Sequence, residues 1–381
     1  MMPKKNIRLY LTAALLVFSL IFVFKSMLLP GLKGKQTDYS KYKLLGSAIS
    51  IIKSHYVEEP HAVQTMEGGF KGMIDSLDVL SGYLSKPLMD AYRAQLREPY
   101  PEVGLILYKS YGAFPQVIGI REGSPADLKG IRYGDFISVL DGQSTLTMSM
   151  REANLLLKDK VKKTVELKVM RSEGTEEILL DRKILFTDNY SFTPLPKFAG
   201  ILKIHTLHSC VDSIQSTLAP RLKGKTTPLI LDLRNCHEGS IPEVQKLVNL
   251  FLQANDIGHF SSKNGTDSAL SAPREPELPD IPLYIWINRA TIDQAEIAAA
   301  VLKDMGRARI VGVPSPGLVS RQQPFSFGDG SGILLTTEIF ILKSASPLWQ
   351  KGIQPDEQLS ARESKTEDYI KATQTLMLKK S

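Results

Sequence analysis

The chain has few cysteines and no clusters of like charge. Only two cysteines occur among its 381 residues, Cys210 and Cys236, which excludes a disulfide scaffold and a multi-cysteine metal site; the two can pair or remain free. Lysine and arginine outnumber aspartate and glutamate by 47 to 40 but form no runs, so we expect no nucleic-acid partner. Because metal-ligand spacings and a phosphate-binding glycine loop are also missing, we expect no metal and no cofactor.

Long hydrophobic runs are missing too, with one exception at the N-terminus. Basic residues at positions 4, 5 and 8 precede an apolar to weakly polar run from Leu9 to Phe24, which is typical of a signal peptide or a signal anchor. No Ala-x-Ala cleavage site follows, so we favour an uncleaved anchor over a cleaved signal. Residues 1–35 are therefore predicted to form a cytoplasmic tip and one transmembrane helix. The protein is then expected in the bacterial inner (cytoplasmic) membrane, with a single pass and its body facing the periplasm or the exterior.

The rest of the chain divides by its pattern of apolar residues. Residues 36–98 have the apolar spacing of helices. Residues 99–186 contain short strands and turns, which predict a β-rich domain. Residues 187–360 alternate between strands and helices, which predicts an α/β domain with parallel strands.

Three shorter segments carry more specific expectations. Ser240 can cap a helix that starts at Ile241. Residues 258–280 are rich in serine, asparagine, glycine and proline and are expected to form a loop. Residues 361–381 are expected to be a polar tail with a helical patch near its end.

The stretch Gly123–Gly142, GSPADLKGIRYGDFISVLDG, resembles the most typical part of a PDZ domain. The resemblance implies a groove between a strand and a helix that receives an extended peptide as an added strand. The residues at the place where such domains bind a terminal carboxylate are Gly104, Leu105, Ile106 and Leu107.

Further motifs on both sides of this segment are similar to those of the carboxy-terminal processing (tail-specific) serine peptidases. They occur in the family's order: SHYV at 54–57, SLDVLSGYL at 76–84, LDLRN at 231–235, AEIAAA at 295–300, GRARIVG at 306–312 and GIQPD at 352–356. The likeness spans about residues 40–360. It implies a crotonase/ClpP-like β-β-α body of α/β class with an inserted PDZ domain.

Such peptidases use a serine nucleophile and an unprotonated lysine as the base. At the matching positions this chain has Asp293 for the nucleophile and Leu318 for the base. The family's supporting glutamine survives as Gln322, and Gly239 is what remains of the loop for the oxyanion hole. Near a helix N-terminus, Asp293 is expected to cap free N–H groups and to have a lowered pKa, which makes it a poor nucleophile.

Some other residues could supply a displaced nucleophile. Thr291 lies two residues before Asp293, and Ser315 and Ser320 lie in the loop that lost the lysine. Cys236 and His237 place a thiol next to an imidazole, but adjacent residues rarely point toward each other. We therefore expect the chain to be catalytically inactive.

The sequence thus predicts a membrane-anchored pseudoprotease that binds protein C-termini or unfolded segments through its PDZ domain. It would act as an adaptor or regulator, with a partner protease or further copies of itself as additional partners. Two alternatives stay open: an active serine-type endopeptidase with a displaced nucleophile, and a structural scaffold that binds no peptide.

Overall fold

The computed structural model describes residues 39–185, 188–265, 267–276, 278, 280–360 and 365–379. The chain divides into two compact units, Met1–Met66 and Glu67–Ser381, and each is described by itself. The described part of the first unit contains helix α2 (Tyr39–His55) and the start of helix α3 (Ala62–Asp75). Several apolar side chains of these helices are exposed, including those of Leu44 and Ile51.

No helix in the described residues is long and apolar enough to cross a membrane. This finding contradicts the single-pass location in the bacterial inner membrane, with the body in the periplasm or exterior, that the sequence predicted. Helix α2, for example, has 17 residues and includes three lysines, which are costly in a bilayer. The run Leu9–Phe24, on which the expected transmembrane helix depended, lies outside the described residues.

The second unit contains an α/β region (residues 190–378) built on a six-stranded sheet with the order β17-β14-β13-β10-β9-β8. Neighbouring strands from β9 to β17 run parallel, and β8 runs antiparallel to β9 at one edge. The strands are β8 (Tyr190–Thr193), β9 (Gly200–Ile204), β10 (Leu229–Asp232), β13 (Leu283–Ile287), β14 (Ala308–Gly312) and β17 (Glu357–Gln358). The parallel α/β arrangement confirms the fold class that the strand and helix pattern indicated.

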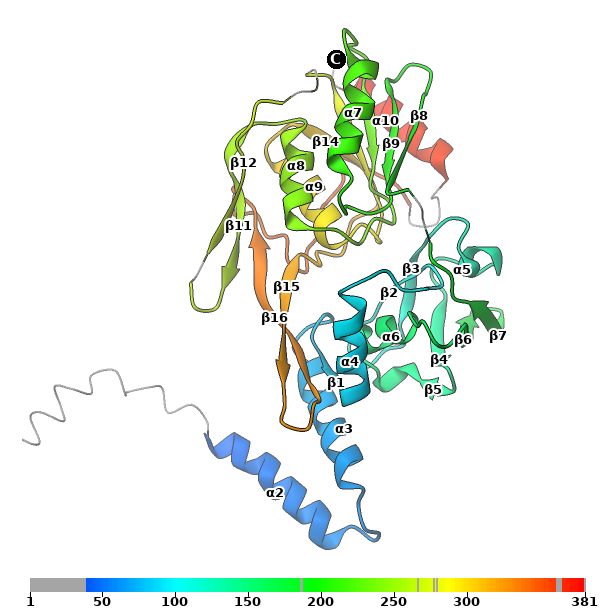
Figure 1. The fold of residues 1–381 in the computed structure, drawn as a ribbon, viewed down its shortest axis with the longest axis vertical. Helices are drawn as coiled ribbons and strands as arrows, with labels where there is room; N and C mark the ends of the chain where they lie inside the picture. Colours follow the sequence, from blue (N-terminus) through cyan, green and yellow to red (C-terminus); the bar gives the residue numbers. More distant parts are fainter. Residues whose placement is uncertain are drawn as a thin grey trace, which may run out of the picture. The chain divides into compact units, whose positions relative to one another are not determined.

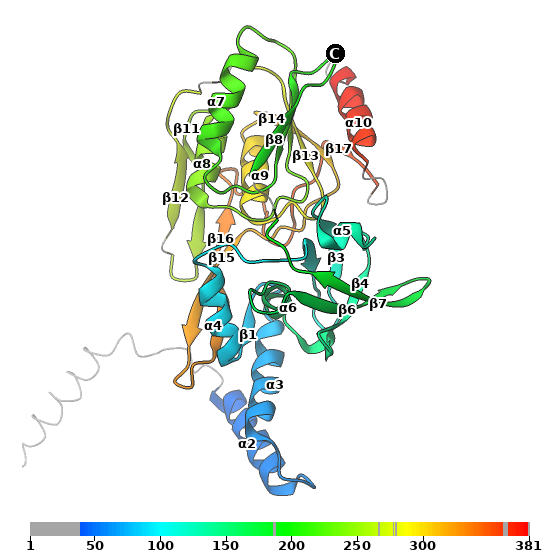
Figure 2. The ribbon, with the colours of Figure 1, turned by 45° about the vertical axis from the view of Figure 1, so that its right-hand side comes forward.

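Both faces of this sheet are buried, and alternate residues of each strand face opposite sides. Leu229, Leu231 and Ile285 belong to one apolar core, whereas Ile230 and Trp286 belong to another. The first face is covered by α7 (Val211–Leu222), α8 (Ile241–Asn249) and α9 (Asp293–Asp304), and the second by α10 (Thr366–Leu378). Figures 1 and 2 show α10, in red, on the side of the sheet away from α7 and α8.

Helix α10 occupies the segment expected as a polar tail. The side chain of Tyr369 is fully buried, and its hydroxyl donates a hydrogen bond to the carbonyl of Ile287 at 2.9 Å. The indole N–H of Trp286 donates to Oγ1 of Thr373, also at 2.9 Å. The N-terminal cap that the sequence predicted for α8 is confirmed, since Oγ of Ser240 accepts from the N–H of Glu243.

A second sheet corrects the expectation of a loop over residues 258–280. Its order is β1-β16-β11-β12, with β15 also paired to β16, and it contains β1 (Gly82–Leu84), β11 (Ala254–Ser262), β12 (Ser268–Ala272), β15 (Ser320–Ser326) and β16 (Gly332–Ile341). Strand β11 pairs with both β12 and β16. The strands were not predicted because the segment is mostly polar. Only a few of its side chains, such as those of Phe260 and Leu270, enter the core.

A β-rich insert (residues 102–183) forms the third sheet, with the order β2-β3-β4-β6-β7 and β5 paired to β4. Its two ends meet, because the backbones of Glu102 and Lys183 exchange two hydrogen bonds of 2.9 Å. Helix α4 (Lys86–Gln95) precedes it. The elements are β2 (Leu105–Tyr108), β3 (Gln116–Ile120), α5 (Pro125–Leu128), β4 (Phe136–Leu140), β5 (Gln143–Ser144), the 3-10 helix η1 (Thr145–Thr147), α6 (Met150–Leu156), β6 (Thr164–Arg171) and β7 (Gly174–Asp181).

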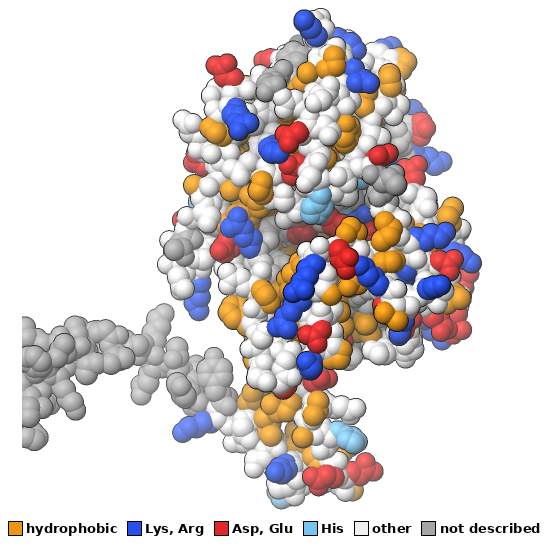
Figure 3. All heavy atoms as spheres, viewed as in Figure 1, with side chains coloured by type: hydrophobic (Ala, Val, Ile, Leu, Met, Phe, Trp, Pro, Cys, Tyr) orange, Lys and Arg blue, Asp and Glu red, His pale blue; other side chains and the backbone are white. Residues whose placement is uncertain are grey.

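Charges of both signs are interspersed over the surface, so no single-sign field dominates the face seen in Figure 3. Inside the protein, one carboxylate has a clear structural role. Oε2 of Glu243, on α8, accepts hydrogen bonds from the backbone N–H groups of Cys210 and Val211 at 2.8 and 2.9 Å, and so binds the N-terminus of α7 to α8.

We predict that Glu243→Ala lowers the free energy of unfolding by about 2 kcal/mol, because two buried N–H groups lose their acceptor. Urea denaturation of the purified chain measures this effect. The control Glu177→Ala removes an exposed carboxylate of β7 and should leave stability nearly unchanged. Equal destabilisation by the two substitutions would contradict the role given to Glu243.

Candidate functional site

The candidate site lies where the parallel strands β10 and β13 end. The turn from Asn288 to Ile292 connects β13 to α9, which begins at Asp293. The hydroxyl of Thr291 fixes this turn, since it donates to the carbonyl of Leu233 at 2.8 Å and accepts from the N–H of Asn288 at 3.0 Å. Thr291 is fully buried, so its hydroxyl serves the structure and does not face a substrate.

The backbone and the pKa of Asp293 both differ from the sequence-based expectation. Its φ is 53°, in the left-handed region, and no side-chain cap is formed at the start of α9. Burial raises the pKa of Asp293 to about 7; Arg151 opposes this shift and Glu238 adds to it. The expected lowering of this pKa was wrong, because loss of hydration outweighs the favourable field of a helix N-terminus.

Leu318, at the position of the base, lies in an apolar cluster with Leu80, Ile106, Ile118 and Ile292. Only 1% of Leu318 is exposed. Ile292, which directly precedes Asp293, belongs to the same cluster. A leucine in this cluster can neither accept a proton nor orient an attacking group.

A buried carboxylate, which sequence analysis missed, holds the backbone at Leu318. Glu296 is fully buried on α9, and its two oxygens accept from the N–H groups of Gly317 and Leu318 at 2.7 and 2.9 Å. Burial raises the pKa of Glu296 to about 8, although hydrogen bonds from Ser315, Gly317 and Leu318 oppose the shift. Its sequence context gave only a helix motif, so nothing pointed to the distant loop that it holds.

Gln322 contacts a second residue that the sequence did not indicate. Its Oε1 accepts from Nη2 of Arg151 at 2.8 Å, and its Nε2 donates to Oγ of Ser320 at 2.8 Å. Arg151 belongs to α6 of the β-rich insert. The insert thereby supplies a positive charge that acts on both Gln322 and Asp293. Because these residues lie far from Arg151 in the sequence, no local sequence pattern indicates the interaction.

The loop after β10 carries Gly239, and it also packs beside α9. A Cβ added at Gly239 would lie 2.6 Å from Cβ of Leu207 and 3.1 Å from Cβ of Gln294, so only glycine fits. Glu238, just before it, binds Nζ of Lys158 at 2.7 Å and Nη2 of Arg121 at 3.1 Å. Both cations come from the β-rich insert, so an ionic contact fixes this loop to the insert.

Two of the candidates for a displaced nucleophile, Ser315 and Cys236, are held in other roles, and Lys158 of the insert cannot serve as a base. Oγ of Ser315 accepts from the N–H of Ile353 at 2.8 Å. Cys236 is fully buried and, like Cys210, is a free thiol; burial raises the pKa of Cys236 far above its usual range. Burial lowers the pKa of Lys158, but Glu238 and Glu102 outweigh it, so the net shift is upward and Lys158 stays protonated.

His237 is no partner for the Cys236 thiol. Its Nε2 lies 3.1 Å from Nη2 of Arg121, and its Nδ1 lies 3.3 Å from the carbonyl of Asn235. Burial, together with the charge of Arg121, lowers the pKa of His237 to about 3. The imidazole is therefore neutral and engaged with the insert.

The four residues suggested for peptide binding form one end of the β-rich insert. Leu105 and Leu107 point into the core of the insert, whereas Ile106 belongs to the cluster around Leu318. Gly104 has a φ of 83°, and a Cβ there would lie 2.2 Å from Cβ of Ser124. Within the described residues β2 pairs with β3 alone, and Leu105, Ile106 and Leu107 are buried.

The raised pKa of Asp293 predicts a pH effect on stability. Between its usual pKa of 3.8 and the folded value of about 7, the folded chain holds a proton that the unfolded chain has released. The stabilisation that this bound proton gives the folded chain is therefore fully present below pH 3.8. It is lost as the pH rises through 7, and the free energy of unfolding falls by at most about 1.4 kcal/mol per pH unit. We expect Asp293→Asn to become progressively more stable relative to the wild type across this window.

Urea denaturation at a series of pH values measures the difference. The exposed control Asp181→Asn should follow the wild type at every pH. A difference between Asp293→Asn and the wild type that is the same at about pH 5 and about pH 8, on either side of the raised pKa, would contradict the assignment.

Comparisons with known proteins agree with the motifs. Residues 199–359 match the sequence profile of peptidase family S41. The "Carboxy-terminal processing protease CtpA" of Bacillus subtilis is 25% identical over 384 residues, which cover 98% of this chain and 81% of that protein. A "Probable CtpA-like serine protease" of Staphylococcus aureus is 22% identical, and the match covers 96% of this chain and 73% of that protein.

Among solved structures, a photosystem II D1 C-terminal processing protease superposes with a TM-score of 0.69 over 84% of this chain and 86% of its own, at 24% identity. This likeness shows that the mixed α/β fold is shared. The sequence matches show that residues 199–359 are similar to peptidase family S41, and that nearly the whole chain is similar to carboxy-terminal processing proteases.

Proposed function

We propose that this chain is a non-cleaving member of the S41 family that binds C-terminal or unfolded segments of other proteins. It would serve as an adaptor or regulator of proteolysis. The observation that carries the proposal is the environment of Leu318, whose buried side chain fills the place of the base with hydrocarbon. Peptide hydrolysis by this family needs a neutral lysine at that place.

The nucleophile position supports the same proposal. A carboxylate at position 293 carries negative charge above its pKa of about 7, and such a charge opposes the oxyanion that forms during acyl transfer. Below that pKa a neutral carboxylic acid is a weak nucleophile. In a well-studied serine protease, removal of the nucleophile alone lowers turnover by on the order of a millionfold.

Peptide binding is the function left to the β-rich insert, which we interpret as a PDZ domain. Strand β2 has no second strand partner in the described residues, α6 lies beside it, and the turn at Gly104 fits only glycine. An extended segment can pair its backbone with β2 while its terminal carboxylate meets the N–H groups that follow Gly104.

We predict no cleavage of an unstructured, C-terminally tailed polypeptide by the full chain. Mass spectrometry of the products measures this, with an active carboxy-terminal processing protease as the positive control. Serine- and thiol-directed covalent probes should leave the chain unlabelled. Fragments whose formation is abolished by Ser315→Ala, Ser320→Ala or Thr291→Ala would instead establish an active peptidase with a displaced nucleophile.

We also predict that Gly104→Ala weakens binding of a peptide with a free C-terminus by about tenfold or more, because the new Cβ displaces Ser124 and reshapes the turn. Fluorescence anisotropy with a labelled peptide measures the affinity. The matched control is Gly142→Ala, at a positive φ of 76° but in open space. Substitutions at Leu105 or Leu107 are unsuitable for this test, since both side chains belong to the core of the insert.

Thermal unfolding of both glycine variants shows whether they remain folded. If the wild type binds no peptide, with or without a free carboxylate, the chain is a structural scaffold and the binding proposal is wrong.

A further inference from the structure

A cavity of about 530 Å³ lies between the β-rich insert and the α/β region, within the second unit. It opens at the carboxyl ends of β10, β13 and β14, where Arg234, Asn288 and Val313 line it. Crevices at this end of a parallel sheet are where α/β proteins bind ligands, and the volume is typical of a ligand site. Residues 104–107, all of which the structure describes, do not line it.

The cavity is strongly basic. Its lining includes five cationic side chains and only two carboxylates. Two of the cations are neutralised: Lys203 binds Glu122 at 2.9 Å, and Arg234 binds Asp232 at 2.6 Å. The guanidinium of Arg234 also lies over the rings of both Trp286 and Tyr369, at 4.9 and 4.4 Å from their centroids.

The other three cations, Arg132, Arg289 and Lys365, form no ion pair with a carboxylate in the described part of the chain. Arg132 comes from the insert between α5 and β4, Arg289 follows β13, and Lys365 immediately precedes α10. Arg289 is only partly exposed, so its charge is partly desolvated without a compensating anion. Arg132 and Lys365 are exposed, and three cations without a carboxylate partner around one cavity favour a ligand that carries several negative groups.

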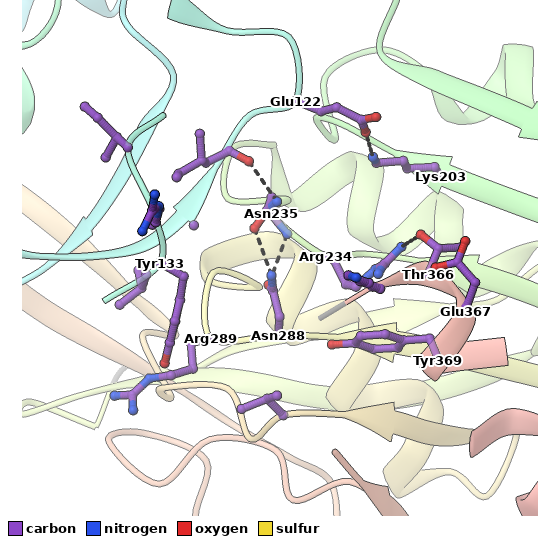
Figure 4. A pocket seen from close by; sticks show the side chains of 17 residues that line it. Glu122, Tyr133, Lys203, Arg234, Asn235, Asn288, Arg289, Thr366, Glu367 and Tyr369 are labelled. Atoms are coloured by element: carbon purple, nitrogen blue, oxygen red, sulfur yellow. Dashed lines mark hydrogen bonds and ion pairs between the residues drawn. The ribbon is translucent and has the colours of Figure 1, made fainter. Parts of the chain in front are cut away.

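Polar and charged side chains lie on more than one side of the cavity, so a ligand that contacts several of them has to extend across it. Figure 4 shows Arg289 and Lys203 at opposite sides of the cavity, with Asn235 and Asn288 between them. The two asparagines bind each other, and Asn235 also binds the carbonyl of Ile120, which gives the cavity a rigid floor. Apolar side chains such as those of Ile120 and Val313 line it as well.

We propose that this cavity binds an acidic polypeptide segment, in which aspartate or glutamate side chains alternate with aliphatic ones. The carboxylates pair with Arg132, Arg289 and Lys365, and the aliphatic side chains contact Ile120 and Val313. The site is separate from the edge of β2, so it needs neither a free C-terminus nor the proposed function of that edge.

The test uses the full chain and a short fluorescent peptide of alternating acidic and aliphatic residues with an amidated C-terminus. A companion peptide replaces every Glu and Asp by Gln and Asn. We expect the acidic peptide to bind in low salt at least about tenfold more tightly than its neutral companion, and to weaken as salt screens the ion pairs.

The variant Arg132→Gln/Arg289→Gln should weaken binding of the acidic peptide by about tenfold. Its control is Arg97→Gln/Arg274→Gln, which removes the same charge from exposed arginines outside the cavity and should change the affinity little. Lys365→Gln, at an exposed position, provides a second variant if the double variant does not fold. Gly104→Ala should bind the amidated acidic peptide as the wild type does, which separates this site from the edge of β2.

Three results would overturn the proposal. If the cavity variant and its control weaken binding of the acidic peptide equally, the net charge of the protein, and not the cavity, determines the affinity. If the acidic and neutral peptides bind with equal affinity, the carboxylates of the peptide do not contribute to binding. Displacement of the peptide by inorganic phosphate, beyond the effect of sodium chloride at the same ionic strength, would identify the cavity as a site for small anions.

Discussion

Burial of both faces of the parallel sheet is the constraint on which the rest of the structure depends. A sheet of this kind must be covered on both sides to keep its apolar strands from water. Here three helices cover one face and α10 covers the other. Because the strands run parallel, their carboxyl ends meet at one edge, and the turns there have to carry Asp293, Gly239 and the basic cavity together.

The same edge carries the residues of the candidate site. Glu296 holds the loop at Leu318 through two backbone hydrogen bonds, and Gln322 and Gly239 remain in place. The β-rich insert is bound to this framework by charges, through Arg121 and Lys158 on one side of the site and Arg151 on the other. Positions 293 and 318, on which the proposed loss of catalysis rests, carry one acidic and one aliphatic side chain.

The sequence predicted the parts of the fold whose pattern is local. Alternating strand and helix patterns, the cap at Ser240 and the ordered motifs were sufficient for the α/β region. The strands β11 and β12 could not be predicted because their stability comes from pairing with β16, which lies far along the chain. Arg151 and Glu296 were missed for a related reason: each acts on a residue far away in sequence, and pairing of that kind leaves no periodic pattern. The pKa of Asp293 was misjudged because helix position is visible in a sequence and burial depth is not.

The cluster around Leu318 joins the insert, the segment before it and the α/β region, since Ile106, Leu80 and Ile292 all belong to it. A lysine placed at 318 would have to bring an ammonium group into this hydrocarbon contact and forgo the burial of a leucine side chain, which is worth about 2 kcal/mol. A substitution that introduces a lysine at 318 would therefore lower the stability of the chain before the new side chain could contribute to any chemistry. The packing around residue 318 thus disfavours a charged side chain at that position.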